Sequence, residues 1–288
     1  MSSYARTLWL ASIMRDVITN ANIVKTIKNG YPREGQDKIV LPVLNNSFTA
    51  QSDKSADTSF NDASKSFKEI VLDKVAYCGW AAKRLELLDT DTSLRDELRK
   101  EASETLVKSV ENAVITAVMN GIAAGNKLTF DGVIDGATTL TYEMLLAIEE
   151  KFNEANIPRD NRYMMIGAKM ETKLKSMKDS TDTPVFISVD RSGSTILTGG
   201  TLGKVLSFNV LTSNDVPKTS DAGVASGSGT KNAALFYHRD VIGYGSERSL
   251  FMPESTYNKT KRQYEDIVEL SYGYGILRDT YGITLRED

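Results

Sequence analysis

Residues 91–120, DTSLRDELRKEASETLVKSVENAVITAVMN, decide the fold. Asp91, Thr92 and Ser93 offer side-chain oxygens to the first amides of a helix, and Asp96 follows Ser93 at the spacing of a capping box. Apolar residues recur every three or four positions, and charged residues lie on other faces. The apolar set is Leu94, Leu98, Ala102, Leu106, Val110, Ala113 and Ala117, and the charged set is Arg95, Arg99, Lys100, Glu104, Lys108 and Glu111. The pattern predicts one amphipathic rod of about 45 Å, which is long enough to be the spine of a domain. An ordinary core helix is the alternative.

The residues before this helix predict two strands with a long polar tip between them. Residues 37–48 and 67–78 read as extended, because Ile39, Leu41 and Val43 alternate with Val40 and Leu44. Residues 45–66 are dominated by Ser, Asp, Asn, Thr and Lys and cannot form a core. Two such strands would expose paired edges, which favours cover from another subunit, and Pro42 fits an edge strand. A hairpin packed on its own domain is the alternative.

Residues 4–20 predict a short amphipathic helix at the N-terminus. Its broad apolar side carries Trp9, Leu10, Ile13, Met14 and Val17, and breakers follow at Gly30, Pro32 and Gly35. A helix separated from the body in this way must lay its apolar face on its own domain or on a neighbouring chain. The sequence leaves both choices open.

The residues after the spine predict a mixed α/β body. Thr141 can cap a helix that ends at Asn156 before Pro158, and a buried strand at 163–166 and a helix at 168–177 follow. Further strands are predicted at 205–212 and 233–237, and the Ser/Gly/Thr-rich residues 218–231 predict a loop. Residues 246–266 are polar and extended, and the alternation in 267–285 predicts that the chain ends in strands. The fold class is α+β.

Composition excludes several classes of function. The chain has 288 residues, 41% hydrophobic and 25% charged, with 35 basic and 38 acidic residues, so no positive field would hold nucleic acid or an anionic membrane. Cys78 and His238 are the single cysteine and histidine, so no intramolecular disulfide and no Cys/His metal cluster can form. The longest uncharged run, 112–126, is too short and polar to cross a bilayer, and no signal peptide is apparent. We expect a soluble protein without metal or cofactor.

No motif in the sequence supports catalysis. Gly199-Gly200-Thr201-Leu202-Gly203-Lys204-Val205 has the wrong glycine spacing for a phosphate loop, and Val205 replaces the residue that would hold magnesium. Tyr272-Gly273-Tyr274-Gly275 is not a dinucleotide fingerprint and predicts a tightly packed strand. His238 has no nucleophile at a local spacing, and Cys78 lies in an apolar, extended context where a thiol packs rather than reacts. The sequence therefore predicts no catalytic, cofactor-binding or metal-binding residue, and no enzyme.

Several stretches resemble a known family in order and spacing. Residues 152–163, FNEANIPRDNRY, are similar to a passage of helix, N-x-P, short turn, Arg and buried strand. Residues 203–217, GKVLSFNVLTSNDVP, are similar to a second passage, and 233–240 and 272–278 resemble the strands that follow. With the arm, two-stranded loop and spine helix, they resemble the major capsid proteins of tailed bacteriophages, the Hong Kong 97-like fold that encapsulin shells share.

The resemblance implies a division of the chain into four parts. These are an N-terminal arm at 1–36, an extended loop at 37–78, a peripheral domain at 79–136 and 246–271 with the spine helix, and an axial domain at 137–245 and 272–288. In the family, axial domains gather around fivefold and sixfold axes, and loops and arms overlap neighbouring subunits. Some members form covalent cross-links from a loop lysine, but no motif here assigns that role to Lys54, Lys65 or Lys68.

The resemblance also implies a function and a set of partners. The chain would assemble through pentamers and hexamers into an icosahedral shell that packages double-stranded DNA without sequence-specific contacts. The implied partners are copies of itself, a separate scaffolding protein, a portal and a decoration protein, with no membrane. The implied location is the virion capsid, assembled in the host cytoplasm. An encapsulin-type compartment enclosing a cargo enzyme is the alternative, and an oligomeric enzyme or a tail-tube protein are readings of other classes.

Overall fold

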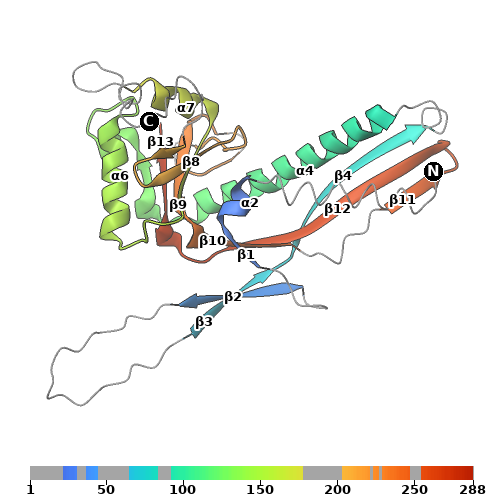
Figure 1. The fold of residues 1–288 in the computed structure, drawn as a ribbon, viewed down its shortest axis with the longest axis horizontal. Coiled ribbons are helices and arrows are strands. Elements are labelled where there is room, and N and C mark those ends of the chain that lie inside the picture. The colour runs from blue at the N-terminus through green and yellow to red at the C-terminus, as the bar shows by residue number, and fades with distance from the viewer. Residues whose placement is uncertain are drawn as a thin grey trace, which may run out of the picture.

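The structure is a computed structural model that describes residues 22–30, 37–44, 65–83, 92–177, 203–220, 223–226, 229–246 and 254–287. The predicted arm helix at 4–20, residues 45–64 of the predicted loop tip at 45–66 and the irregular segment at 178–200 lie outside these residues. Lys65 and Ser66, the last residues of the predicted tip, belong to a strand instead. Figure 1 shows an elongated molecule in which a long helix runs beside a ribbon of long strands, with an α/β body at one end and a strand pair projecting below.

The spine helix α4 spans Thr92–Gly121, as the sequence predicts. Its buried positions form two rows with a spacing of four residues, so the buried stripe rotates by about 40° per step around the axis. The rows are Ala102, Leu106, Val110, Val114, Val118 and Ile122, which follows the helix, and Ser103, Val107, Glu111, Ile115 and Met119. The stripe rotates because α4 contacts strands β4 and β12, helix α2 and strand β13 along its length. The structure does not describe the side chains of residues 92–99.

Two details of the predicted stripe are wrong. Ala113 and Ala117 pack against the core but are only half-buried, and Val114 and Val118, which the predicted stripe left out, are fully buried in it. Glu111, predicted on a charged face, is buried and accepts a hydrogen bond from the Ile23 backbone N–H at 3.3 Å. The carboxylate thus accepts from an amide in the first turn of α2 (Asn22–Thr26), which packs in the core beside α4.

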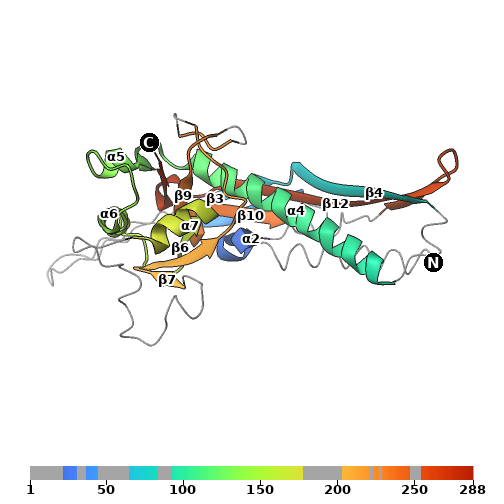
Figure 2. The same ribbon diagram turned by 90° about the horizontal axis from the view of Figure 1, so that it is seen from above.

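A five-stranded sheet lies along the spine. Its members are β1 (Lys28–Gly30), β10 (Ile242–Ser246), β12 (Gln263–Ile276), β11 (Glu254–Asn258) and β4 (Lys74–Lys83), with β12 pairing to β10, β11 and β4. Figure 2 shows α4 lying beside β12 and β4 over much of their length. Ala76 and Cys78 of β4 and Val268 and Leu270 of β12 belong to the same core as the helix. The alternating residues face away from it.

A six-stranded sheet forms the body at the other end. Its order is β5 (Lys127–Thr129), β13 (Gly282–Arg286), β9 (Ala233–His238), β6 (Arg162–Ile166), β8 (Phe208–Thr212) and β7 (Lys204–Val205). One face packs with helices α6 (Tyr142–Glu154) and α7 (Ala168–Lys175), and residues of the other face join the core around α4. The predicted cap is confirmed, because Thr141 Oγ1 accepts from the Met144 backbone N–H at 3.4 Å. Short turns of helix lie at Ala124–Asn126 (η1), Phe130–Val133 (α5), Arg239–Val241 (η3) and Asp279–Tyr281 (η4).

The predicted strand at 205–212 is divided. Leu206 has a positive φ of 52°, and the turn that it makes lets Val205 of β7 pair with Phe208 of β8. A continuous strand would need φ to stay negative, so the tight turn ends the first strand after two residues.

The strand pair is a hairpin of β2 (Lys38–Leu44) and β3 (Lys65–Val71). The prediction of one strand over 67–78 is wrong, because the chain leaves the hairpin at Leu72 and Asp73 and enters the five-stranded sheet as β4. The Leu72 N–H donates to the Asp37 carbonyl at 2.8 Å and closes the base of the hairpin.

The boundaries of the two sheets fall at residues other than the expected domain limits. The expected loop part contains residues 74–78, which form the first half of β4 in the five-stranded sheet. The expected peripheral part contains β5, which belongs to the six-stranded sheet, and the expected axial part contains residues 242–245 and 272–276 of the five-stranded sheet.

Candidate assembly surfaces

The hairpin β2–β3 has two unlike faces. Its inner face is buried and carries Ile39, Leu41 and Ile70, which form a small core with Leu72 and Leu277. Its outer face is exposed: Phe67 is 61% exposed, and Val40 and Val71 are about half exposed. The alternation predicted at 39–43 is confirmed. The chain's own sheet covers the inner face, so the expected cover from another subunit can concern only the outer face.

The inner face packs against a surface made of glycine. We call Gly30, Gly243, Gly245, Gly273 and Gly275 the glycine floor, because all five lie on the side of β1, β10 and β12 that faces the hairpin. The tyrosines that alternate with them point the other way, toward the main core. The prediction that residues 272–275 form a tightly packed strand is confirmed, and the hairpin is the element that packs against this strand.

The sheet formed by β4 and β12 has a second apolar face, which the residues described by the structure leave uncovered. Tyr77 is 73% exposed, and Val75 and Ile267 are also exposed, on the side opposite α4. Glu269 pairs with Tyr77 across the two strands and is exposed beside it. Contiguous exposed apolar residues on a sheet face are typical of protein–protein contacts. We call these four residues the outer sheet face.

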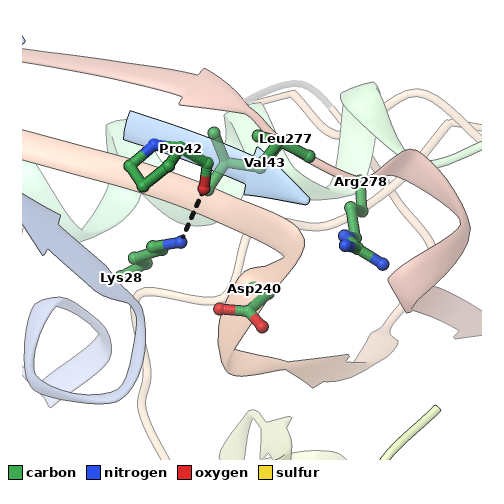
Figure 3. A pocket seen from close by; sticks show the side chains of 6 residues that line it. All are labelled: Lys28, Pro42, Val43, Asp240, Leu277 and Arg278. Atoms are coloured by element: carbon green, nitrogen blue, oxygen red, sulfur yellow. Dashed lines mark hydrogen bonds between the residues drawn. The ribbon is translucent and has the colours of Figure 1, made fainter. Parts of the chain in front are cut away.

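A pocket of about 190 Å³ lies where the hairpin meets the body, lined by Lys28, Pro42, Val43, Asp240, Leu277 and Arg278 (Figure 3). The Lys28 ammonium donates to the Pro42 carbonyl at 3.1 Å, and this bond ties the hairpin to the edge of the sheet. Arg278 donates to the Tyr281 hydroxyl at 2.6 Å. The pocket is smaller than a drug-sized ligand site, and its charged groups hold parts of the fold together.

The motif at 152–163 forms a buried polar centre. The Arg162 side chain is fully buried and donates to the Pro158 carbonyl at 2.9 Å, to Asn153 Oδ1 at 3.0 Å, to Ser207 Oγ at 3.2 Å and to the Ile157 carbonyl. Burial lowers the pKa of its guanidinium from the ordinary value. The arginine thus joins the end of α6 to the β7–β8 turn. The Asn of the N-x-P motif, Asn156, has a different role, because it takes a positive φ of 52° just after α6 ends.

The residues that the sequence analysis considered for catalysis take part in packing and hydrogen bonds within the fold. His238 is buried, and its Nδ1 accepts from the Asp240 backbone N–H at 3.2 Å, which starts the η3 turn. Burial lowers the pKa of His238. Cys78 packs against the core around α4, and burial raises the pKa of its thiol. Of the suspected phosphate loop, residues 199–202 lie outside the described residues, and Lys204 and Val205 form β7.

Among the described residues, no group of three or more His, Cys, Asp or Glu side chains is placed to hold a metal ion. In the same part of the chain, no helix is long and apolar enough to cross a membrane.

Three features of the structure were not predicted from the sequence. The exposed positions of Phe67 and Tyr77 were not assigned to a surface, and the burial of Glu111 was not expected. A signal for the glycine floor was present, because Gly243-Tyr244-Gly245 repeats the alternation of Gly273-Tyr274-Gly275. The register confirms that the two segments pair glycine to glycine.

A long helix lies beside an elongated sheet, a hairpin projects from that sheet, and the described residues leave two apolar faces uncovered. The chain belongs to the phage capsid protein family, whose model matches residues 80–287. Its fold is the Hong Kong 97-like fold, so the resemblance noted in the sequence is confirmed. No curated protein has a sequence that matches this chain.

Solved structures share the fold at low sequence identity. The capsid of cyanophage P-SCSP1u is 15% identical, with a TM-score of 0.65 over 90% of this chain and 86% of that chain. The capsid protein of an empty GTA particle is 11% identical, with a TM-score of 0.67 over 93% and 90%. The virus-like particle from Pyrococcus furiosus is 14% identical, with a TM-score of 0.58 over 99% and 100%.

Proposed function

We propose that copies of this capsid protein assemble through pentamers and hexamers into an icosahedral shell that encloses double-stranded DNA. Membership of the phage capsid protein family supports a shell-forming role. The observation that carries the proposal is the pair of uncovered apolar surfaces, the outer face of the hairpin and the outer sheet face, which no other described part of the chain covers. A repeated contact between unlike surfaces generates closed rings when its rotation closes.

In this proposal, each of the four expected parts of the chain has its own role in the shell. The hairpin is the base of an extended loop that lies on a neighbouring copy, with Val40, Phe67 and Val71 at the contact. The six-stranded sheet with α6 and α7 forms the axial domain around fivefold and sixfold axes. The five-stranded sheet with α4 forms the peripheral domain. Of the expected arm at 1–36, the described residues 22–30 pack in that domain as α2 and β1.

The proposed partners beyond copies of the chain are a scaffolding protein, a portal and a decoration protein. The shell would form in the host cytoplasm and become the virion capsid. The formal net charge of −3 supports enclosed DNA that is held without sequence-specific contacts, because a mildly acidic chain does not attract phosphate in bulk. The role is structural and calls for no catalytic residue, cofactor or metal.

A compartment that encloses a cargo enzyme is the second candidate. It is favoured by the likeness to the virus-like particle from Pyrococcus furiosus, which covers 99% of this chain. The contents of purified particles separate the two candidates, since nuclease-protected DNA supports the capsid and a co-purifying enzyme supports the compartment.

Substitution of Phe67 tests the hairpin contact. Phe67→Asp places a charge on the outer face without touching the buried inner face, so the subunit should fold with an unchanged melting temperature and fail to form particles. Phe67→Leu keeps an apolar side chain and is the matched control, which should assemble. Deletion of residues 45–66 should likewise leave a soluble subunit without stable particles. Sedimentation and negative-stain imaging measure the outcome, and normal shells from Phe67→Asp and from the deletion would refute the overlap.

A further inference from the structure

We propose that the glycine floor is a socket that sets the direction of the hairpin, and that Ile39 is the side chain that positions the hairpin in it. This inference rests on the proposed role of the hairpin in assembly, and it assigns the residues that control that role. It follows from how closely the hairpin approaches the sheet.

The floor is organised in rows across three strands. Gly30 of β1, Gly245 of β10 and Gly273 of β12 are register partners and form one row. The second row joins Gly243 to Gly275 and reaches Lys28 at the sheet edge. Lys28 is the side chain that donates to the Pro42 carbonyl of the hairpin, so a hydrogen bond closes the edge of the socket.

The hairpin side chains occupy the space that side chains would otherwise fill. A Cβ at Gly245 would lie well within 3.0 Å of Ile39 Cδ1, and a Cβ at Gly30 would lie 2.6 Å from Ile39 Cγ2. Ile39 therefore sits between two glycines of adjacent strands. Ile70 fits over the second row, where a Cβ at Gly243 would lie 2.7 Å from its Cδ1.

The backbone does not require these glycines. Among the described residues, the glycines with positive φ are Gly136 and Gly223, and neither belongs to the floor. Alanine at Gly245 is therefore compatible with the strand conformation. Its closest contact would be with Ile39 of the hairpin, and a smaller one would be with the Gly30 carbonyl oxygen of β1, 3.2 Å from the added Cβ. Gly273 lies at the pivot, since a Cβ there would overlap the Val71 carbonyl, which is backbone and cannot rotate away.

A small displacement at the glycine floor would produce a large change in the direction of the hairpin. Ile39 is buried in a small core with Leu41 and Ile70, which restricts rotation of its Cδ1. Relief of the overlap at Gly245 should therefore shift the hairpin itself, by about 2 Å to reach ordinary contact. Ile39 pairs with Ile70, two residues from the junction at Leu72, which is a lever arm of about 7 Å. The hairpin would then tilt by about 16°, and Phe67, about 17 Å from the junction, would move by about 5 Å. A displacement of that size separates surfaces that need contacts of about 4 Å.

The experiment measures hairpin direction and assembly separately. Nitroxide labels at Phe67→Cys and Asn112→Cys, in a Cys78→Ser background, report the distance from the hairpin to α4 in unassembled full-length subunits. Gly245→Ala should change this distance by about 5 Å, and Ile39→Val, which removes Cδ1, should restore it in the double variant. Gly125→Ala is the matched control, because a Cβ there meets nothing within 4 Å.

Assembly of the unlabelled variants gives the second readout. Gly245→Ala should yield folded subunits with at least a tenfold loss of closed shells, and Gly245→Ala/Ile39→Val should regain them. Ile39→Ala creates no overlap and should broaden the label distances while lowering shell yield, so it tests the socket even if Gly245→Ala fails to fold. An unchanged distance in Gly245→Ala, or normal shells despite a changed distance, would overturn the proposal. Normal shells from Phe67→Asp would instead refute the hairpin overlap itself.

Discussion

Replacement of Arg162 by methionine tests whether the buried polar centre stabilises the body of the capsid protein. The guanidinium donates four hydrogen bonds, two to main-chain carbonyls and two to side-chain oxygens. Methionine has a similar length and no donor, so the change removes the bonds with little loss of volume.

The expected loss follows from the acceptors that remain. Each buried acceptor without a donor costs about 1–3 kcal/mol, and water that enters the site recovers part of that. We therefore expect Arg162→Met to lower the free energy of unfolding by about 3–5 kcal/mol, against a typical total of about 5–15 kcal/mol.

Denaturant unfolding of unassembled subunits measures this change through the transition midpoint. Asn153→Ala removes one of the four acceptors and should cost about 1 kcal/mol. In the double variant the two losses should not add, because the Asn153 contact is already absent without the arginine. A loss below about 1 kcal/mol for Arg162→Met, or full additivity, would refute the view that these bonds stabilise the fold.

Three further changes test local features of the body. Thr141→Ala removes the cap of α6 and should lower the free energy of unfolding by about 1 kcal/mol, measured by thermal unfolding. Because burial lowers the pKa of His238 below 6.5, its neutral form stabilises the fold above pH 6.5, and stability should fall as the pH drops below that value; His238→Gln should reduce this dependence between pH 7.5 and 5.5. Burial raises the pKa of Glu287, but hydrogen bonds from Lys173 and Asn232 outweigh it and the net pKa is lowered from 4.5. Its contribution should be complete above pH 4.5 and be lost as the pH falls through the lower folded value, and Glu287→Gln should flatten the acid limb of the stability curve.

The start of the spine helix could be predicted because its signals are local. Capping residues and a short apolar repeat specify where a helix begins, and the structure starts α4 at Thr92. The later part of the stripe could not be predicted, because which face is buried depends on what packs there. Glu111 is buried by a contact with Ile23, which lies 88 residues away in the chain.

The same distinction explains the strands. The alternation at Ile39, Leu41 and Val43 identifies a face but not its partner. The partner is formed by glycines of β1, β10 and β12, and the last two strands lie about 200 residues or more further along the chain. The division at Leu72 was missed because residues 67–78 are uniformly compatible with a strand. Two strands form here because the pairing partner changes: β3 pairs with β2, and β4 pairs with β12. Strand pairing depends on tertiary structure, so the local sequence does not specify it.

The two apolar faces of strand β4 bear on assembly. Ala76 and Cys78 face α4, and the alternate residues Val75 and Tyr77 are also apolar although nothing in the described chain covers them. A strand that is apolar on both faces is typical of a sheet buried on both sides. One side has its cover in the spine helix, so we infer that a neighbouring copy covers the other side. On this view Tyr77→Asp should leave the subunit folded and weaken assembly, whereas Cys78→Asp should unfold the subunit, because its side chain faces the core. Circular dichroism and sedimentation of the two variants compare the faces directly, and equal loss of fold in both would show that Tyr77 is not a surface residue of the subunit.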